Sequence, residues 1–269
     1  MEEIRVKTEE KLIQGNPICY YVSGAENSEC IVFLHAAYAD HTQFNSQVNF
    51  FAANYKVIVV DMLGHGKSTD AAKGDGIEKM AEYIAEIADA ENAEKIHLVG
   101  VSLGTVVVQD FANKFPARTA SIACFGGYNI NNFDVSMQKE NSGAQMGMML
   151  KAIFSTKAFA KANMKISAVT PQAQQDFYEM NLRFPKKSFM YLAGLNGMVN
   201  KVKPEPRNYP VLIGCGDSDI PMELKVCEIW HNEEPTSKKV IIPNSGHLVN
   251  MDAPDSFNDT LLKFLKNEL

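Results

Sequence analysis

The sequence predicts an α/β protein built around a mostly parallel, doubly wound sheet. Short β-rich runs alternate along the chain with segments of helical periodicity, which is the pattern of repeated strand–helix units. Most of these runs are continuously apolar, as expected of strands that helices cover on both faces. With 269 residues, of which 46% are hydrophobic and 22% charged, the chain can bury a large core.

The strands are expected in two groups. Residues around 4–6 and 18–22 favour an antiparallel hairpin, joined through the turn-forming residues 14–17. Six further runs read as strands of the parallel sheet, at 30–34, 56–60, 95–99, 120–125, 211–215 and 239–242. The sheet should therefore contain about eight strands.

Helical periodicity fills the gaps between the strands. One helix face is formed by Ile77, Met80, Ala81, Ile84, Ile87 and Ala88. A second helix starts near Ser102 and ends before Pro116, because proline cannot continue it. A third follows Pro254 to the C-terminus.

The segment 128–208 interrupts this alternation. It contains no convincing β run, only helical stretches separated by prolines, so we expect a helical cap inserted after strand 6, between core segments 1–127 and 209–269. Methionine is adaptable enough to line a pocket for apolar substrates, but it equally serves plain core packing. Eight of the 13 methionines fall here: Met137, Met146, Met148, Met149, Met164, Met180, Met190 and Met198.

Composition excludes several classes of protein. The net charge of −6 argues against nucleic acid or anionic lipid as a partner. No apolar run is long enough for a membrane helix, and the charged start lacks the apolar region of a secretory signal, so we expect a cytoplasmic protein. The five cysteines form no C-x-x-C pair and should be structural thiols. They are Cys19, Cys30, Cys124, Cys215 and Cys227.

The clearest chemical signal is Gly100-Val101-Ser102-Leu103-Gly104, which directly follows a predicted strand and opens a predicted helix. In a nucleophile elbow the serine occupies a strained strand-to-helix turn, and the flanking glycines keep side chains from colliding with the sheet and the helix. We therefore predict Ser102 as a nucleophile. The alternative is a simple βα turn in which glycine only permits tight packing.

A serine nucleophile needs a base, and the base needs an orienting acid. His247 follows the last strand on a loop that should lie at the same carboxyl edge of the sheet as Ser102. The loop after the preceding strand carries Asp217 and Asp219. Asp219 lies farther out and can turn toward His247, so we predict it as the acid; Asp217 remains the alternative.

These motifs resemble the α/β-hydrolase superfamily over essentially the whole chain, and the resemblance implies the α/β-hydrolase fold. The matching segments, in order, are 33–37, Asp61-Met62-Leu63-Gly64-His65-Gly66-Lys67-Ser68, the Ser102 elbow, 216–219 and Gly246-His247. The Asp-x-x-Gly-His-Gly-x-Ser segment is typical of the lid-bearing esterase, C–C hydrolase and haloperoxidase-like branch. In that branch the acid aligns with Asp219.

The resemblance also implies an oxyanion hole formed by the backbone N–H groups of Ala37 and Leu103. This sequence departs from the family by having Ala36 where glycine is commoner, so a positive φ at that position would be strained. His35 is expected to be structural.

Together these features predict a serine hydrolase that cleaves a small carboxylic ester or thioester with an apolar acyl part, without metal or organic cofactor. Alternatives with the same triad are C–C bond hydrolysis and cofactor-free haloperoxidase-like activity. A ligand-binding member of the fold without turnover is a rival from another class, and the intact Ser102, Asp219 and His247 set argues against it. A homodimer is compatible with the sequence, which carries no signal for oligomeric state.

Overall fold

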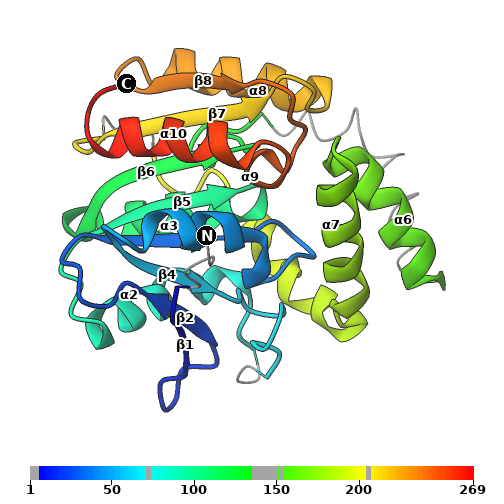
Figure 1. Ribbon diagram of the computed structural model, residues 1–269, viewed down its shortest axis with the longest axis horizontal. Helices are drawn as coiled ribbons and strands as arrows, with labels where there is room; N and C mark the ends of the chain where they lie inside the picture. Colours follow the sequence, from blue (N-terminus) through cyan, green and yellow to red (C-terminus); the bar gives the residue numbers. More distant parts are fainter. Residues whose placement is uncertain (1–5, 71–73, 135–150, 152–153, 204–206) are drawn as a thin grey trace, which may run out of the picture.

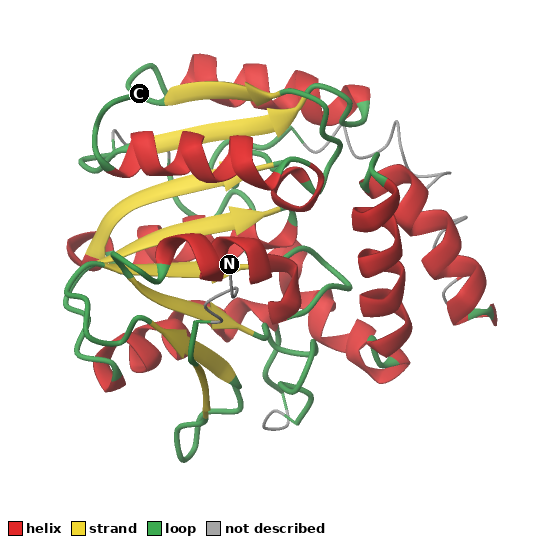
Figure 2. Cartoon of the chain, viewed as in Figure 1, coloured by secondary structure: helices red, strands yellow, loops and turns green. Residues whose placement is uncertain are grey.

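The central element is an open sheet, with helices on both faces (Figures 1 and 2). This computed structural model describes residues 6–70, 74–134, 151, 154–203 and 207–269. In that part of the chain the sheet has eight strands in the order β1-β2-β4-β3-β5-β6-β7-β8. The β1–β2 and β2–β4 pairs are antiparallel and the others parallel. The strands are β1 (Thr8–Lys11), β2 (Tyr20–Ser23), β3 (Cys30–Leu34), β4 (Lys56–Val60), β5 (Ile96–Val101), β6 (Thr119–Phe125), β7 (Val211–Gly216) and β8 (Lys238–Ile242).

Alternate residues of the central strands face two different helical layers, which is why these strands are apolar throughout. Ile31 and Phe33 of β3 belong to the same buried cluster as residues of α1, α9 and α10, whereas Val32 and Leu34 belong to the cluster that includes α2, α3 and α8. These helices are α1 (Asn45–Phe51), α2 (Met80–Ala90), α3 (Leu103–Lys114), α8 (Pro221–Glu233), α9 (Val249–Asp252) and α10 (Pro254–Leu265). Short 3-10 turns are η1 (His41–Phe44), η2 (Ile77–Lys79) and η3 (Pro116–Arg118).

The predicted fold class is confirmed, but the first strand of the hairpin was misplaced. It lies at Thr8–Lys11, where it pairs with β2, and not around 4–6; Val6 is outside any strand, and residues 4 and 5 are outside the described residues. The sequence Thr-Glu-Glu-Lys is polar because β1 is a largely exposed edge strand. Such a strand gives no hydrophobic signal.

Between β6 and β7 the chain forms a helical insertion: α6 (Thr156–Ser167), α7 (Pro171–Arg183) and η4 (Lys186–Gly197). No strand occurs in the described part of 128–208. The carboxyl ends of the parallel strands point toward α7, and α6 lies beyond it (Figure 1). The division into two core segments and a cap remains a proposal.

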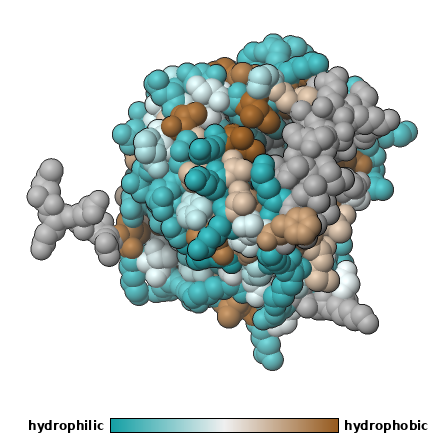
Figure 3. All heavy atoms as spheres, turned by 90° about the vertical axis from the view of Figure 1, so that its right-hand side faces the viewer, coloured by the Kyte–Doolittle hydropathy of each residue, from teal (hydrophilic) through white to brown (hydrophobic). Residues whose placement is uncertain are grey.

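The methionines of the insertion have varied surroundings. Met180 is buried, whereas Met190 is 69% exposed. Figure 3 shows hydrophobic and hydrophilic residues interspersed on this side of the molecule. Met137, Met146, Met148 and Met149 lie outside the described residues, so the predicted methionine lining of a pocket stays a prediction.

Two further structural observations concern the cysteines and the length of the helices. All five cysteines are free and buried, each under 2% exposed. None of the helices in the described ranges combines the length and the apolar character required to cross a bilayer.

Candidate active site

Ser102 occupies a sharp turn between β5 and α3. Its φ of 54° and ψ of −115° lie in a region that side-chain-bearing residues rarely adopt. Two hydrogen bonds hold this backbone: the Ser102 N–H donates to the Phe125 carbonyl at 2.9 Å, and the Ser102 carbonyl accepts from the Thr105 N–H at 2.9 Å. A strained residue held by the surrounding structure at a strand–helix junction is a candidate functional position.

The two flanking glycines are required by close packing. A Cβ at Gly104 would lie 2.1 Å from the Leu34 carbonyl oxygen, and a Cβ at Gly100 would lie 2.5 Å from the carbonyl carbon of Gly104. Both distances are too short for any side chain, so α3 approaches β3 and β5 closely only because these positions are glycine.

His247 and Asp219 are in direct contact. The imidazole Nδ1 lies 3.2 Å from each carboxylate oxygen of Asp219, and the Asp219 side chain is fully buried. Asp219 also accepts the Ile220 N–H at 2.8 Å. With Nδ1 donating to the carboxylate, Nε2 is left as the acceptor of a proton.

The end of β6 brings His247 to the elbow. Gly126 follows Phe125, whose carbonyl accepts the Ser102 N–H. A Cβ on Gly126, which has a φ of 63°, would lie 3.0 Å from both Cε1 and Nδ1 of His247. Ser102 and His247 therefore lie against two consecutive residues of the same strand end.

The electrostatics of the site favour a charged imidazole. Burial disfavours the charged form of His247, but the hydrogen bond that Nδ1–H donates to Asp219, the charge of Asp219 and the charge of Glu223 outweigh it and raise the pKa of His247 to about 9. Burial raises the pKa of Glu223 to about 7; the positive charge of His247 opposes this rise and the negative charge of Asp219 adds to it. Glu223 Oε2 is buried without a hydrogen-bond partner in the described part of the chain.

The alternative acid, Asp217, makes different contacts. Its carboxylate accepts the backbone N–H groups of Asn244 at 3.0 Å and Ser245 at 3.2 Å, together with the Ser218 hydroxyl at 3.0 Å. These hydrogen bonds, the one from Asn244 first, lower the pKa of Asp217. Asp217 thus holds the backbone of the histidine loop, whereas Asp219 holds the imidazole.

The predicted oxyanion loop follows β3. Its positive φ is at Tyr38 (66°) and not at Ala36, so the strain considered for Ala36 does not arise. The Ala36 N–H donates to Gln43 at 2.9 Å, while the next residue, Ala37, is partly exposed. Leu103 is the first residue of α3, where the backbone N–H has no acceptor within the helix.

Two histidines near this loop are buried and neutral. His35 Nδ1 donates to the Ala36 carbonyl at 2.8 Å and Nε2 accepts the Met62 N–H at 2.9 Å, with the tautomer assigned from these partners. Burial lowers the pKa of His35. Burial, together with the neighbouring His35, lowers the pKa of His65 to about 3. The contacts of His35 are those of a structural residue, as expected.

Sequence reasoning missed several residues that shape the site. No role was assigned to the buried Asp61, which accepts the backbone N–H groups of His41 at 2.8 Å and Lys67 at 2.9 Å. Glu223 was likewise assigned no role. The glycine pair at the end of β6, which includes Gly126, was an available signal because glycine at a strand end often marks a close approach.

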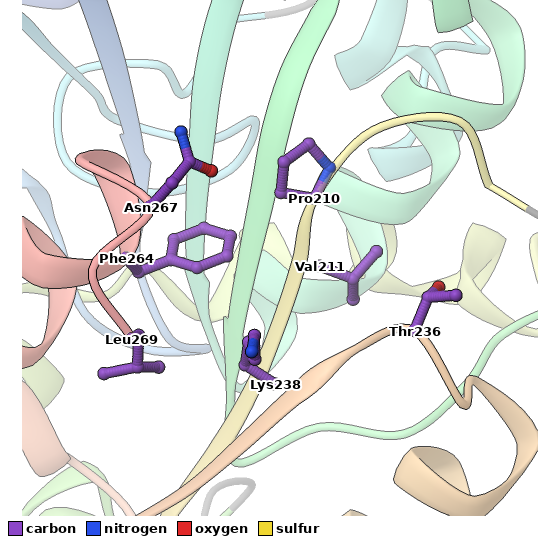
Figure 4. Close-up of a pocket in the computed structure, with 7 residues that line it drawn as sticks. All are labelled: Pro210, Val211, Thr236, Lys238, Phe264, Asn267 and Leu269. Atoms are coloured by element: carbon purple, nitrogen blue, oxygen red, sulfur yellow. The ribbon is translucent and has the colours of Figure 1, made fainter.

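A separate hollow of about 150 Å³ lies at the opposite end of the sheet (Figure 4). It is bordered by the first residues of β7 and β8, Val211 and Lys238. Ser102, Asp219 and His247 follow the carboxyl ends of β5, β7 and β8. This hollow is therefore not part of the candidate site.

Comparison with known proteins agrees with this architecture. The family model described as "alpha/beta hydrolase fold" matches residues 29–254. A 3-oxoadipate enol-lactonase from Acinetobacter baylyi is 34% identical over 91 residues, which cover 34% of this chain and 34% of that protein. A 2-hydroxy-6-oxononadienedioate/2-hydroxy-6-oxononatrienedioate hydrolase from Burkholderia vietnamiensis is 22% identical over 92% of this chain and 90% of its own length.

Among solved structures, a thermophilic esterase from Thermogutta terrifontis superposes with a TM-score of 0.79 at 19% identity, covering 97% of this chain and 99% of the esterase. At that identity the likeness concerns the fold. The family match, in contrast, spans most of the sequence and includes the elbow and the Asp219 and His247 loops. The chain belongs to the α/β-hydrolase fold family and is a hydrolase of that type.

Proposed function

We propose that the protein is a serine hydrolase that cleaves a small carboxylic ester or thioester with an apolar acyl part. The observation that carries this proposal is the His247–Asp219 contact at 3.2 Å beside the strained Ser102 turn. Nucleophile, base and acid stand in the chain order Ser, Asp, His of this family. Because one relative is named an enol-lactonase, a lactone is a suitable first substrate to test. A lactone is a cyclic ester.

The proposed reaction has two halves. Ser102 Oγ attacks the acyl carbon while its proton passes to Nε2 of His247, and the new negative oxygen is held by the Ala37 and Leu103 N–H groups. When the tetrahedral intermediate collapses, the leaving alcohol or thiol takes the proton from His247. Water then attacks the acyl-enzyme by the same route and releases a carboxylic acid. Asp219 accepts the hydrogen bond from the Nδ1–H group throughout, without taking the proton, and orients the ring.

The test is labelling and turnover together. A fluorophosphonate probe should modify the folded protein at one equivalent, on Ser102, and p-nitrophenyl esters of short acyl chains should be hydrolysed. The Ser102→Ala protein is the matched control and should do neither. A folded wild-type protein that forms no adduct and releases no nitrophenol would refute the proposal.

C–C bond hydrolysis is the second candidate. The Burkholderia vietnamiensis relative, named as a hydrolase of 2-hydroxy-6-oxononadienedioate, matches 92% of this chain. Turnover of a diketone-type substrate, with negligible release of p-nitrophenol from esters, would favour C–C bond hydrolysis.

We also propose a cytoplasmic location for the protein. The free, buried state of all five cysteines supports this proposal.

A further inference from the structure

The buried carboxylate of Asp252 joins the N-terminal end of helix α7 to the core. Asp252, at the end of α9, accepts the Val169 N–H at 3.0 Å, the Thr170 N–H at 2.8 Å and the Thr170 hydroxyl at 2.8 Å. Thr170 is the residue that caps α7. The start of the helix is thus bonded to one carboxylate, which is 8% exposed as a residue.

The same carboxylate also holds the histidine loop. Asp252 Oδ2 accepts the Gly246 N–H at 2.9 Å. On the other side of His247, the Leu248 N–H donates to the Ser167 carbonyl at 2.8 Å, just before α7. Both neighbours of His247 in the chain are therefore bonded to this junction, one through Asp252 and one directly.

At its other end α7 is joined to the loop that follows β3. Arg183, the last residue of the helix, donates from Nε and Nη2 to one oxygen of Asp40, at 3.0 and 2.6 Å. The Asp40 side chain is 7% exposed. The next residue, Phe184, packs edge-on against the ring of Tyr38, with centroids 5.1 Å apart. Charge and packing therefore act on the loop that carries Ala37.

The middle of α7 belongs to the same buried apolar cluster as residues of these two loops. Ala173, Phe177 and Met180 are spaced along one helix face and are buried. They belong to the apolar cluster that also contains Ala36 and Leu248, which lie one residue from Ala37 and His247 respectively. A helix of 13 residues is about 20 Å long and rigid enough to relate the two loops to each other.

We propose that α7 is a strut that sets the histidine loop and the oxyanion loop relative to each other, with Asp252 as the positioning residue for His247 and Asp40 as the positioning residue for Ala37. The proposal rests on the proposed function for the roles of His247 and Ala37. On this view α7 belongs to the framework of the active site in addition to covering it.

The first test replaces Asp252 by Asn. The amide keeps the shape but turns one acceptor into a donor, so either the Gly246 or the Thr170 N–H loses its partner. If His247 moves away from Asp219, its pKa should fall toward the ordinary value, because Asp219 and Glu223 are the charges that raise it. We expect kcat to fall on the order of 10²-fold, KM to change less, and the acid limb of the pH profile to move to lower pH.

The matched control is Asp176→Asn, the same chemical change on the exposed face of α7. Asp176 bonds only to Gln172 in the described structure, one turn earlier on the helix. This variant should retain the wild-type kcat and pH profile. Asp40→Asn should lower kcat about tenfold without moving the acid limb, because it disturbs an oxyanion donor and leaves the base in place.

The decisive readout does not depend on turnover. The ring resonances of His247 in labelled protein can be titrated by NMR in each variant. Asp252→Asn should lower the pKa of His247, and neither Asp176→Asn nor Asp40→Asn should. If Asp252→Asn does not fold, Thr170→Val removes the hydroxyl that donates to Asp252 and that also accepts the Ala173 N–H at the start of α7, and it should produce a smaller change in the same direction.

An unchanged pKa of His247 in the folded Asp252→Asn or Thr170→Val protein would overturn the proposal that α7 positions the histidine loop. Absence of ester turnover and of fluorophosphonate labelling in the wild type would overturn the proposed function instead. The two failures are therefore distinguishable, since the titration reports the position of the imidazole whether or not the enzyme acts on esters.

Discussion

The serine loop and the histidine loop reach the same edge of the sheet by different means. The Ser102 turn is built mainly from its nearest neighbours: Gly100 and Gly104 permit the approach of α3, and Leu34 supplies the closest surface. The glycines of the turn permit its geometry, and the neighbouring strands supply the Leu34 surface and the Phe125 carbonyl that hold it. Its shape should be insensitive to substitutions elsewhere.

The histidine loop is held by polar contacts, most of them with residues distant in the sequence. Asp217 bonds the N–H groups of Asn244 and Ser245, Asp252 bonds that of Gly246, and the Ser167 carbonyl accepts from the residue after His247. The nucleophile is therefore positioned mainly by close backbone packing at two glycines, and the base mainly by polar contacts of its loop. Substitutions far from the chemistry should therefore disturb the base more than the nucleophile.

The largest expected effect tests whether the two loops act as one unit. Ser102→Ala and His247→Ala should each lower kcat by about 10⁴- to 10⁶-fold, and the double variant should lose no more than the worse single one. Steady-state hydrolysis of a p-nitrophenyl ester measures this. Losses that multiply in the double variant would mean that serine and histidine do not share a step.

Asp219 contacts the imidazole, whereas Asp217 on the same loop bonds backbone N–H groups, so substitutions at the two positions should have different effects. Asp219→Asn should lower kcat about 10⁴-fold, because the ring loses the acceptor that fixes its tautomer. Asp217→Asn should lower kcat by less than about tenfold and should lower the urea midpoint of unfolding slightly, because its carboxylate bonds mainly the backbone. Kinetics and urea unfolding of both proteins measure the contrast. The reverse ranking in kcat would reassign the acid to Asp217.

The steric account of the elbow is tested by stability. Gly104→Ala forces α3 away from the Leu34 carbonyl and should lower Tm by roughly 5 to 10 °C. Gly197→Ala is the matched control, because a Cβ there meets nothing within 4 Å; it should leave Tm unchanged. Equal melting temperatures for Gly104→Ala and wild type would show that the close approach is not required.

The smallest expected effect concerns pH. Because only the neutral imidazole accepts a proton, a His247 pKa of about 9 predicts that kcat/KM rises with pH up to about 9. Glu223→Gln removes one of the charges that raise this pKa, so the acid limb should move to lower pH and activity at pH 7.5 should rise roughly two- to fivefold. Glu228→Gln, on the outer side of the same helix, should leave the limb unmoved.

The same raised pKa has a consequence for folding. An ordinary His pKa is 6.5, so charged His247 stabilises the fold fully below about that pH. This contribution is lost as pH rises from 6.5 through 9. The range of highest activity should thus overlap the range in which the histidine loop is less stable, which urea unfolding at pH 6 and pH 9.5 would measure.

Pattern in the amino-acid sequence is sufficient to predict the fold class and the edge of the sheet at which the candidate site lies. Continuous apolar runs specify buried parallel strands, and the carboxyl ends of such strands share one edge, so Ser102 and His247 could be placed together without coordinates. The polar strand β1 was misplaced because an exposed edge strand has no hydrophobic pattern.

The tertiary structure shows which contacts residues of the same type make. Asp217 and Asp219 occupy one loop and are chemically identical, yet one bonds the backbone and the other the imidazole. Neither Asp40 nor Asp252 belongs to a motif that marks it in the sequence. Their contacts join segments as far as 143 residues apart, and such contacts exist only once the sheet order has brought the segments together.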